Sequence, residues 1–305
     1  MAQAALRSMN GAAVWRDMSQ AELDAAYDQI KYAPNQPQIL KRFASNSEAC
    51  RERCGAPERV AYGSTPIESL DLYSSRVATP PAGAPINVFV HGGAWRSGCA
   101  RDYGFLAEMF VHAGAHFVVP DFAWAQDVDG SLQPVAAQVR RALAWVYSHS
   151  EELGGDPERI YVSGHSSGAH LAAVLLATDW QKGFGLPADV IKGGLCCSGI
   201  YELKPVSLSS RSSYLKITAD VEQTLSPHRN LAQVHAPLLL AYGSLETPEF
   251  KRQSVDFHAA LRQAGKPVQL MLAEGYNHFE ILETLASPYG LLGRAALAQM
   301  RLGES

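Results

Sequence analysis

A serine between two glycines is the first sign of chemistry in this chain of 305 residues. Residues 164–168 are Gly-His-Ser-Ser-Gly, and the apolar residues on both sides predict a strand, a sharp turn and a helix. Such a turn would hold the Ser166 hydroxyl at the carboxyl end of a sheet, where a nucleophile acts. We expect His165 and His170 to support the turn. The pentapeptide alone fits equally well a Gly/Ser loop in which Ser166 caps the helix.

A serine is a weak nucleophile unless a base accepts its proton and an acid orients that base. Among the ten histidines, His278 stands out because it follows the last expected strand, 268–272, on a Gly- and Asn-rich loop. The acid should follow the strand expected over 237–242, and Glu246 lies in that loop. Glu249 is the second choice, because a Thr-Pro helix start and the helix dipole already explain an acid there.

The stretch 91–95, His-Gly-Gly-Ala-Trp, follows the first buried strand, at the place where the second oxyanion loop of lipases and esterases belongs. A tetrahedral intermediate needs preorganised donors for its negative oxygen. We predict the backbone N–H groups of Gly93, Ala94 and Ser167 as these donors. The alternative is a plain turn at the end of a strand.

The order of Ser166, Glu246 and His278 along the chain is the one expected of an α/β-hydrolase. Buried strands alternate with helices, which predicts a mostly parallel central sheet with helices on both faces. The expected strands are 86–90, 117–120, 160–163, 191–197, 237–242 and 268–272, with helices over 132–149 and 248–264, a hairpin over 59–62 and 69–73, and a Pro- and Ala-rich linker over 79–85.

We divide the chain into an N-terminal extension, 1–58, that packs on the core, and an α/β-hydrolase domain, 59–305. In the extension, Ser19 and Glu22 have the spacing of a helix capping box. The stretch from about 201 to 230 is too long for a plain connection, so we interpret it as an inserted, lid-like segment that affects specificity.

The formal net charge of −4 indicates no nucleic-acid or anionic membrane partner, and no stretch is apolar enough for a membrane helix. Residues 1–7 lack the apolar core of a secretory signal, so we expect a cytoplasmic protein. Five cysteines imply no disulfide framework, and Cys50 and Cys54 lack the second ligand pair of a zinc site. We expect a small-molecule substrate, neither metal nor cofactor, and a homodimer as the candidate assembly.

These motifs resemble the arylformamidase (kynurenine formamidase) branch of the α/β-hydrolases, near the hormone-sensitive-lipase-like esterases. The resemblance implies Ser166 as nucleophile, His278 as base and Glu246 as acid, where the family usually has Asp. It also implies cleavage of N-formylkynurenine to kynurenine and formate without a metal or cofactor. Ala94 departs from the family too, since a bulkier residue or Gly is often seen there. The segments that carry the resemblance are 15–35, 91–95, 164–171, 199–205, 225–227 and 246–254.

An aromatic leaving group would need aromatic walls around the serine. Five aromatic residues on or near loops at the carboxyl ends of expected strands are the candidates: Trp95, Tyr103, Phe105, Trp124 and Tyr201. The leading hypothesis is therefore a serine hydrolase that removes a small acyl group from an aryl amide. The alternatives are a carboxylesterase or carbamate/amide hydrolase of small or xenobiotic substrates, and a catalytically silent small-ligand binding protein.

Overall fold

The computed structural model describes residues 12–77 and 83–303. The expected features of residues 1–7 and most of the expected linker, 79–85, lie outside the described residues. The centre of the fold is one eight-stranded sheet with the order β1-β2-β4-β3-β5-β6-β7-β8. The strands β1 and β2 pair antiparallel, as does β2 with β4, whereas every later pairing is parallel. The predicted hairpin and the predicted mostly parallel sheet are confirmed.

Most strand bounds follow the apolar runs of the sequence closely, although β5 begins five residues before the expected strand 160–163, in the polar stretch 155–159. All seven residues of β3 are buried, as expected of a strand covered on both faces. The eight strands are β1 Glu58–Ala61, β2 Ser69–Tyr73, β3 Ala84–Val90, β4 His116–Pro120, β5 Gly155–His165, β6 Gly193–Cys197, β7 Leu238–Gly243 and β8 Val268–Ala273.

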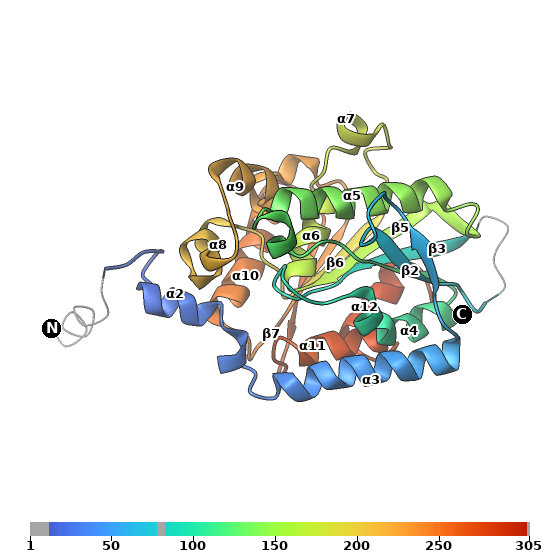
Figure 1. The fold of residues 1–305 in the computed structure, drawn as a ribbon, viewed down its shortest axis with the longest axis horizontal. Helices are drawn as coiled ribbons and strands as arrows, with labels where there is room; N and C mark the ends of the chain where they lie inside the picture. The colour runs from blue at the N-terminus through green and yellow to red at the C-terminus, as the bar shows by residue number, and fades with distance from the viewer. Residues whose placement is uncertain (1–11, 78–82, 304–305) are drawn as a thin grey trace.

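Two separate hydrophobic cores lie against the two faces of the sheet. In β3, Val88 and Val90 join one core, and Phe89 between them joins the other, because successive side chains of a strand point to opposite faces. The first core includes residues of α5 Leu132–His149, α6 Ser167–Leu176 and α10 Pro248–Gln263. The second includes residues of α3 Gln36–Cys54, α4 Ala107–His112 and α12 Leu291–Gln299, which lie together below the sheet in Figure 1.

The N-terminal segment forms α2 Gln20–Ala26, η1 Gln29–Lys31 and the 19-residue helix α3. The predicted capping box at Ser19 and Glu22 is confirmed, with both reciprocal hydrogen bonds present. The length of α3 was not predicted, because its buried stripe is thin. That stripe consists of Ile39, Phe43, Ser47, Cys50 and Cys54, and it packs against the segment that includes η2 Ala100–Leu106.

The remaining elements are short. Within 201–230 the chain forms α8 Lys204–Leu208, η4 Ser210–Ser213, α9 Ala219–Leu225 and η5 Pro227–Arg229. Elsewhere it forms η3 Ala125–Val128, α7 Trp180–Phe184, η6 Leu231–Gln233, α11 Glu280–Glu283 and η7 Thr284–Ala286. Over the described residues, no helix is long and apolar enough to cross a membrane. All five cysteines are free thiols.

Ile39→Ala tests whether α3 is an integral part of the fold. Ile39 is fully buried in the second core, so the substitution should lower the free energy of unfolding by about 2–5 kcal/mol. The matched control is Leu40→Ala one residue later, because Leu40 is 41% exposed and should change stability far less. Urea denaturation measures both. Equal effects of the two substitutions would contradict this packing of α3.

Candidate active site

Ser166 stands on the sharp turn between β5 and α6. Its backbone angles, φ 58° and ψ −124°, lie in a region that non-glycine residues rarely adopt. Only glycine fits at the two flanking positions, because neighbouring backbone atoms lie too close for a side chain. A Cβ on Gly168 would lie 2.0 Å from the carbonyl oxygen of Val90, and one on Gly164 would lie 2.5 Å from that of Gly168. The G-x-S-x-G pattern therefore matches the strained strand-to-helix turn expected around a nucleophile.

The structure brings Ser166, His278 and Glu246 into one chain of hydrogen bonds. Nε2 of His278 lies 2.9 Å from Oγ of Ser166, and Nδ1 lies 2.8 Å from Oε2 of Glu246. All three side chains are buried. Because Glu246 faces Nδ1, that nitrogen carries the proton in neutral His278, which leaves Nε2 free to accept the serine proton.

Glu246 is held from its other side by two donors. Its Oε1 accepts hydrogen bonds from the Ser198 hydroxyl at 2.6 Å and from the Gly243 backbone N–H at 2.7 Å. The loop after β7 thus accommodates the side chain, which is one methylene longer than Asp. Glu249, the second choice for the acid, faces elsewhere and binds Arg252 at 2.5 Å.

Ser198 was not among the sequence candidates. It directly follows β6, at the same sheet edge as Ser166 and His278, and its left-handed φ of 56° belongs to a conformation uncommon outside glycine. A search of every polar residue that follows a strand would have found it.

The predicted oxyanion loop lies opposite Ser166. Gly93, Ala94 and Trp95 have positive φ angles of 123°, 55° and 59°, so this loop holds two non-glycine residues in an unfavourable conformation. Only glycine fits at position 93, because a Cβ on Gly93 would lie 1.9 Å from the carbonyl oxygen of Ser97. No residue in the described part of the chain accepts a hydrogen bond from the N–H of Gly93, Ala94 or Ser167. These N–H groups are therefore free to bind a ligand oxygen.

The strained loop is fixed by Trp95. Its backbone N–H donates to Oγ of Ser167 at 3.2 Å, and its indole Nε1–H donates to Nδ1 of His170 at 3.2 Å. Nε2 of His170 in turn donates to the carbonyl oxygen of Leu225 at 2.8 Å, which assigns the proton to Nε2. One neutral histidine thus connects the oxyanion loop, helix α6 and the 201–230 segment.

Three neutral histidines are buried close to the reacting atoms. Burial lowers the pKa of His170 to about 4. Burial, together with the neighbouring His278, lowers the pKa of His165 to about 3, and burial also lowers the pKa of His91. Nε2 of His165 lies 2.6 Å from the backbone carbonyl oxygen of His278, and this hydrogen bond holds His278 in position. His165 and His170 support the turn, as predicted.

Ser166 and His278 open into a cavity of about 250 Å³. Of the five aromatic residues predicted as its walls, Tyr103 lines the cavity and the other four do not. Trp95 is buried against His170, Phe105 stacks on Phe43, and Tyr201 stacks on Phe257. Trp124 is 37% exposed and bonds the Gly98 carbonyl group. Position near a strand end does not fix the direction of a side chain, so this part of the prediction was wrong.

Among the wall residues that the sequence did not single out, most come from the N-terminal segment, for which sequence reasoning named no site residue. The N-terminal segment contributes Tyr27, Gln29 and Phe43, the 201–230 segment contributes Arg211, and Phe279 follows His278. Only Phe279 had a signal in the sequence, since it adjoins the predicted base. Aromatic rings therefore do surround the site, although most come from Tyr27 directly after α2, from α3 and from the loop after His278.

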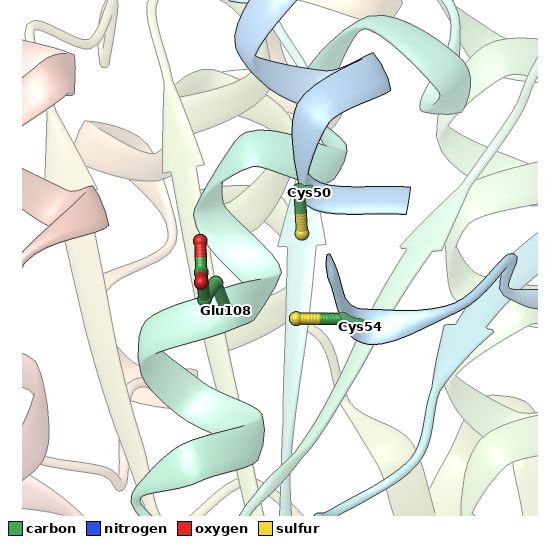
Figure 2. Close-up of side chains that lie close together, drawn as sticks. All are labelled: Cys50, Cys54 and Glu108. Atoms are coloured by element: carbon green, nitrogen blue, oxygen red, sulfur yellow. The ribbon is translucent and has the colours of Figure 1, made fainter. Parts of the chain in front are cut away.

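One group of potential metal ligands lies apart from this cavity. Over the described residues, Cys50, Cys54 and Glu108 are the three side chains whose ligand atoms lie within 4.8 Å of one another (Figure 2). Glu108 already binds Arg53 through two hydrogen bonds, and burial raises the pKa of Cys50 to about 12. A metal would have to displace Arg53 and remove a proton from Cys50. None of the three lines the cavity at Ser166.

The sheet order, the Ser166 turn and the Ser-His-Glu chain define a class, the serine hydrolases of the α/β-hydrolase fold. Residues 70–188 match the family model BD-FAE. The fold is similar to that of a proposed thioesterase from Silicibacter sp. tm1040, with a TM-score of 0.77, 25% identity, and coverage of 89% of this chain and 97% of that chain.

The sequence comparison narrows the class to one family. The chain is 31% identical to the kynurenine formamidase of Danio rerio over 294 residues, which cover 93% of this chain and 97% of that protein. It is 30% identical to the kynurenine formamidase of Salmo salar, with coverage of 89% and 93%. The chain therefore belongs to the kynurenine formamidase family, as the sequence motifs predicted.

Glu246→Gln should lower kcat by about 10³–10⁴-fold, because an amide at this position favours the wrong tautomer of His278. The matched control is Glu249→Gln, which removes an equally buried acid from the same loop and helix region but leaves His278 untouched. Steady-state kinetics, with circular dichroism to confirm folding, measures both variants. A larger loss of kcat in Glu249→Gln than in Glu246→Gln would show that Glu249, not Glu246, is the acid that orients His278.

The buried histidines predict a loss of stability at low pH. The unfolded chain binds a proton at His165 and His170 near pH 6.5, whereas the folded chain does so only near pH 3–4. The free energy of unfolding should therefore fall between pH 7.5 and 5 by about 2 kcal/mol for each histidine. Urea denaturation at both pH values measures this. His170→Gln should reduce the pH dependence by its share, and an unchanged dependence would contradict the burial argument.

Proposed function

We propose that this protein hydrolyses N-formylkynurenine to kynurenine and formate, with Ser166 as nucleophile, His278 as general base and acid, and Glu246 as the group that orients His278. The observation that carries the proposal is the hydrogen-bonded chain of these three side chains at the bottom of a cavity, in a member of the kynurenine formamidase family. The cytoplasmic location and the homodimer stay predictions from the sequence.

The first half of the reaction transfers the formyl group to the enzyme. Oγ of Ser166 attacks the formyl carbon while its proton passes to Nε2 of His278, 2.9 Å away. The carbonyl oxygen becomes negative and accepts hydrogen bonds from the free N–H groups of Gly93, Ala94 and Ser167. The C–N bond then breaks as His278 gives the proton to the aryl nitrogen, which leaves kynurenine and a formyl ester on Ser166.

The second half returns the enzyme to its starting state. A water molecule gives a proton to Nε2 of His278 and attacks the formyl ester, which forms a second negatively charged tetrahedral intermediate held by the same N–H groups. The ester bond breaks, His278 returns the proton to Oγ of Ser166, and formic acid leaves and loses its proton to the solvent as formate. In both halves the carboxylate of Glu246 offsets the positive charge that develops on His278 at 2.8 Å.

The cavity supports an aryl amine as the leaving group. The rings of Tyr27, Phe43, Tyr103 and Phe279 line it. Aromatic side chains give a flat leaving group large contact areas and favourable ring–ring geometry. An aliphatic amine or alcohol would leave part of these rings without a partner.

A comparison of two substrates tests this function. The value of kcat/KM for N-formyl-L-kynurenine should exceed that for p-nitrophenyl acetate, although the ester bond is intrinsically easier to cleave, because only the formamide leaving group fills the cavity. Absorbance assays follow both reactions. If the enzyme hydrolyses the ester but turns over the formamide much more slowly, the formamidase proposal fails and the protein is a carboxylesterase.

A further inference from the structure

The active-site cavity contains a buried positive charge for which the reaction itself has no use. Arg211, from η4 in the 201–230 segment, is only 8% exposed and lines the same cavity as Ser166 and His278. Its Nη2 donates to the backbone carbonyl oxygen of Tyr27 at 3.2 Å. Its Nη1 has no hydrogen-bond partner in the described part of the chain.

Three aromatic rings surround the guanidinium group of Arg211, and Asp28, which also lines the cavity, forms no recorded ion pair with it. Its guanidinium carbon lies 5.3 Å from the centre of the Tyr27 ring, 5.7 Å from that of Trp95 and 6.0 Å from that of Phe250. Glu249, whose neighbour Phe250 packs here, is bound to Arg252 instead. Within residues 12–77 and 83–303, the structure records no ion pair between Arg211 and a carboxylate.

A buried guanidinium without an anionic partner costs free energy, and cation–π contacts offset only part of that cost. The planar guanidinium group matches a carboxylate, to which it can donate two parallel hydrogen bonds. A ligand carboxylate in the cavity would therefore supply the partner that the protein does not.

A second unpartnered polar group lines the same cavity. Gln29 of η1 is 7% exposed, and neither its Oε1 nor its Nε2 has a hydrogen-bond partner among the described residues. Buried amides without partners are uncommon in folded proteins. Since Gln29 and Arg211 come from segments 182 residues apart in sequence and adjoin one cavity, the simplest common partner is a ligand.

We infer that Arg211 and Gln29 form a carboxylate-binding subsite, which selects substrates that carry an anionic carboxylate on the leaving-group side of the bond attacked by Ser166. The inference rests on the proposed function, because the leaving group of N-formylkynurenine is an α-amino acid. Arg211 binds the carboxylate through its guanidinium group. Gln29 donates its Nε2–H to the same carboxylate or accepts the ammonium proton at Oε1.

The test compares N-formyl-L-kynurenine with N-formylkynuramine, which differs only by loss of the carboxylate. A charge-assisted hydrogen bond contributes about 1.5–3 kcal/mol, so kcat/KM of the wild type should favour the carboxylate about 10- to 100-fold. Arg211→Met should abolish most of this preference, mainly through KM, and Arg211→Lys should restore part of it. Gln29→Met should reduce it less. The preference is a ratio of two kcat/KM values measured on the same variant, so a loss of folded enzyme cancels from it.

Arg96 offers a matched control, because it also lines the cavity but is exposed, with its guanidinium over the Tyr214 ring at 4.6 Å. Arg96→Met should keep the preference for the carboxylate. The proposal is overturned if the wild type treats the two formamides alike, or if the preference survives Arg211→Met; its loss in Arg96→Met would assign the carboxylate to Arg96 instead.

A separate measurement distinguishes failure of the subsite from failure of the formamidase function. If the wild type hydrolyses neither formamide, the proposed function fails, and inhibition of p-nitrophenyl acetate hydrolysis then tests the subsite. L-Kynurenine should inhibit about tenfold more strongly than kynuramine, with the difference lost in Arg211→Met. Equal inhibition of the wild type by the two compounds would overturn the subsite.

Discussion

The active site depends on how closely the first turn of α6 approaches the carboxyl end of β3. Gly168 leaves no room for a Cβ, because the Val90 carbonyl oxygen would lie 2.0 Å from it. This approach brings the loop after β3 within reach of the turn at Ser166, and Trp95 bonds Ser167 across the gap. The attacking oxygen and the donors for the negative intermediate therefore share one packing constraint, which fixes their geometry before a substrate binds.

Two segments outside the central sheet complete the cavity. The N-terminal segment supplies Tyr27, Gln29 and Phe43, and the 201–230 segment supplies Arg211. The sheet edge supplies the groups that break the bond, whereas these segments supply most of the other residues that line the cavity. Bond chemistry and substrate choice are therefore encoded in different parts of the sequence.

The sequence predicted the sheet and the three residues that the structure joins by hydrogen bonds, because Ser166, Glu246 and His278 each follow a clear apolar run, and parallel strands end at the same edge. It did not predict that Trp95 faces His170, since that direction depends on left-handed backbone angles fixed by tertiary contacts. The sequence did not indicate Arg211 as a site residue for a similar reason. A buried arginine without a counter-ion looks like any surface arginine until its neighbours are known.

The central claim is that Ser166 is the nucleophile of this site, and covalent labelling tests it most directly. Reaction with a fluorophosphonate followed by peptide mass spectrometry should give one adduct on Ser166, none in Ser166→Ala, and slower labelling when L-kynurenine is present. The glycines, the base at 2.9 Å and the free N–H groups all act on that oxygen. An unlabelled wild-type protein, or an adduct on another residue, would contradict the account.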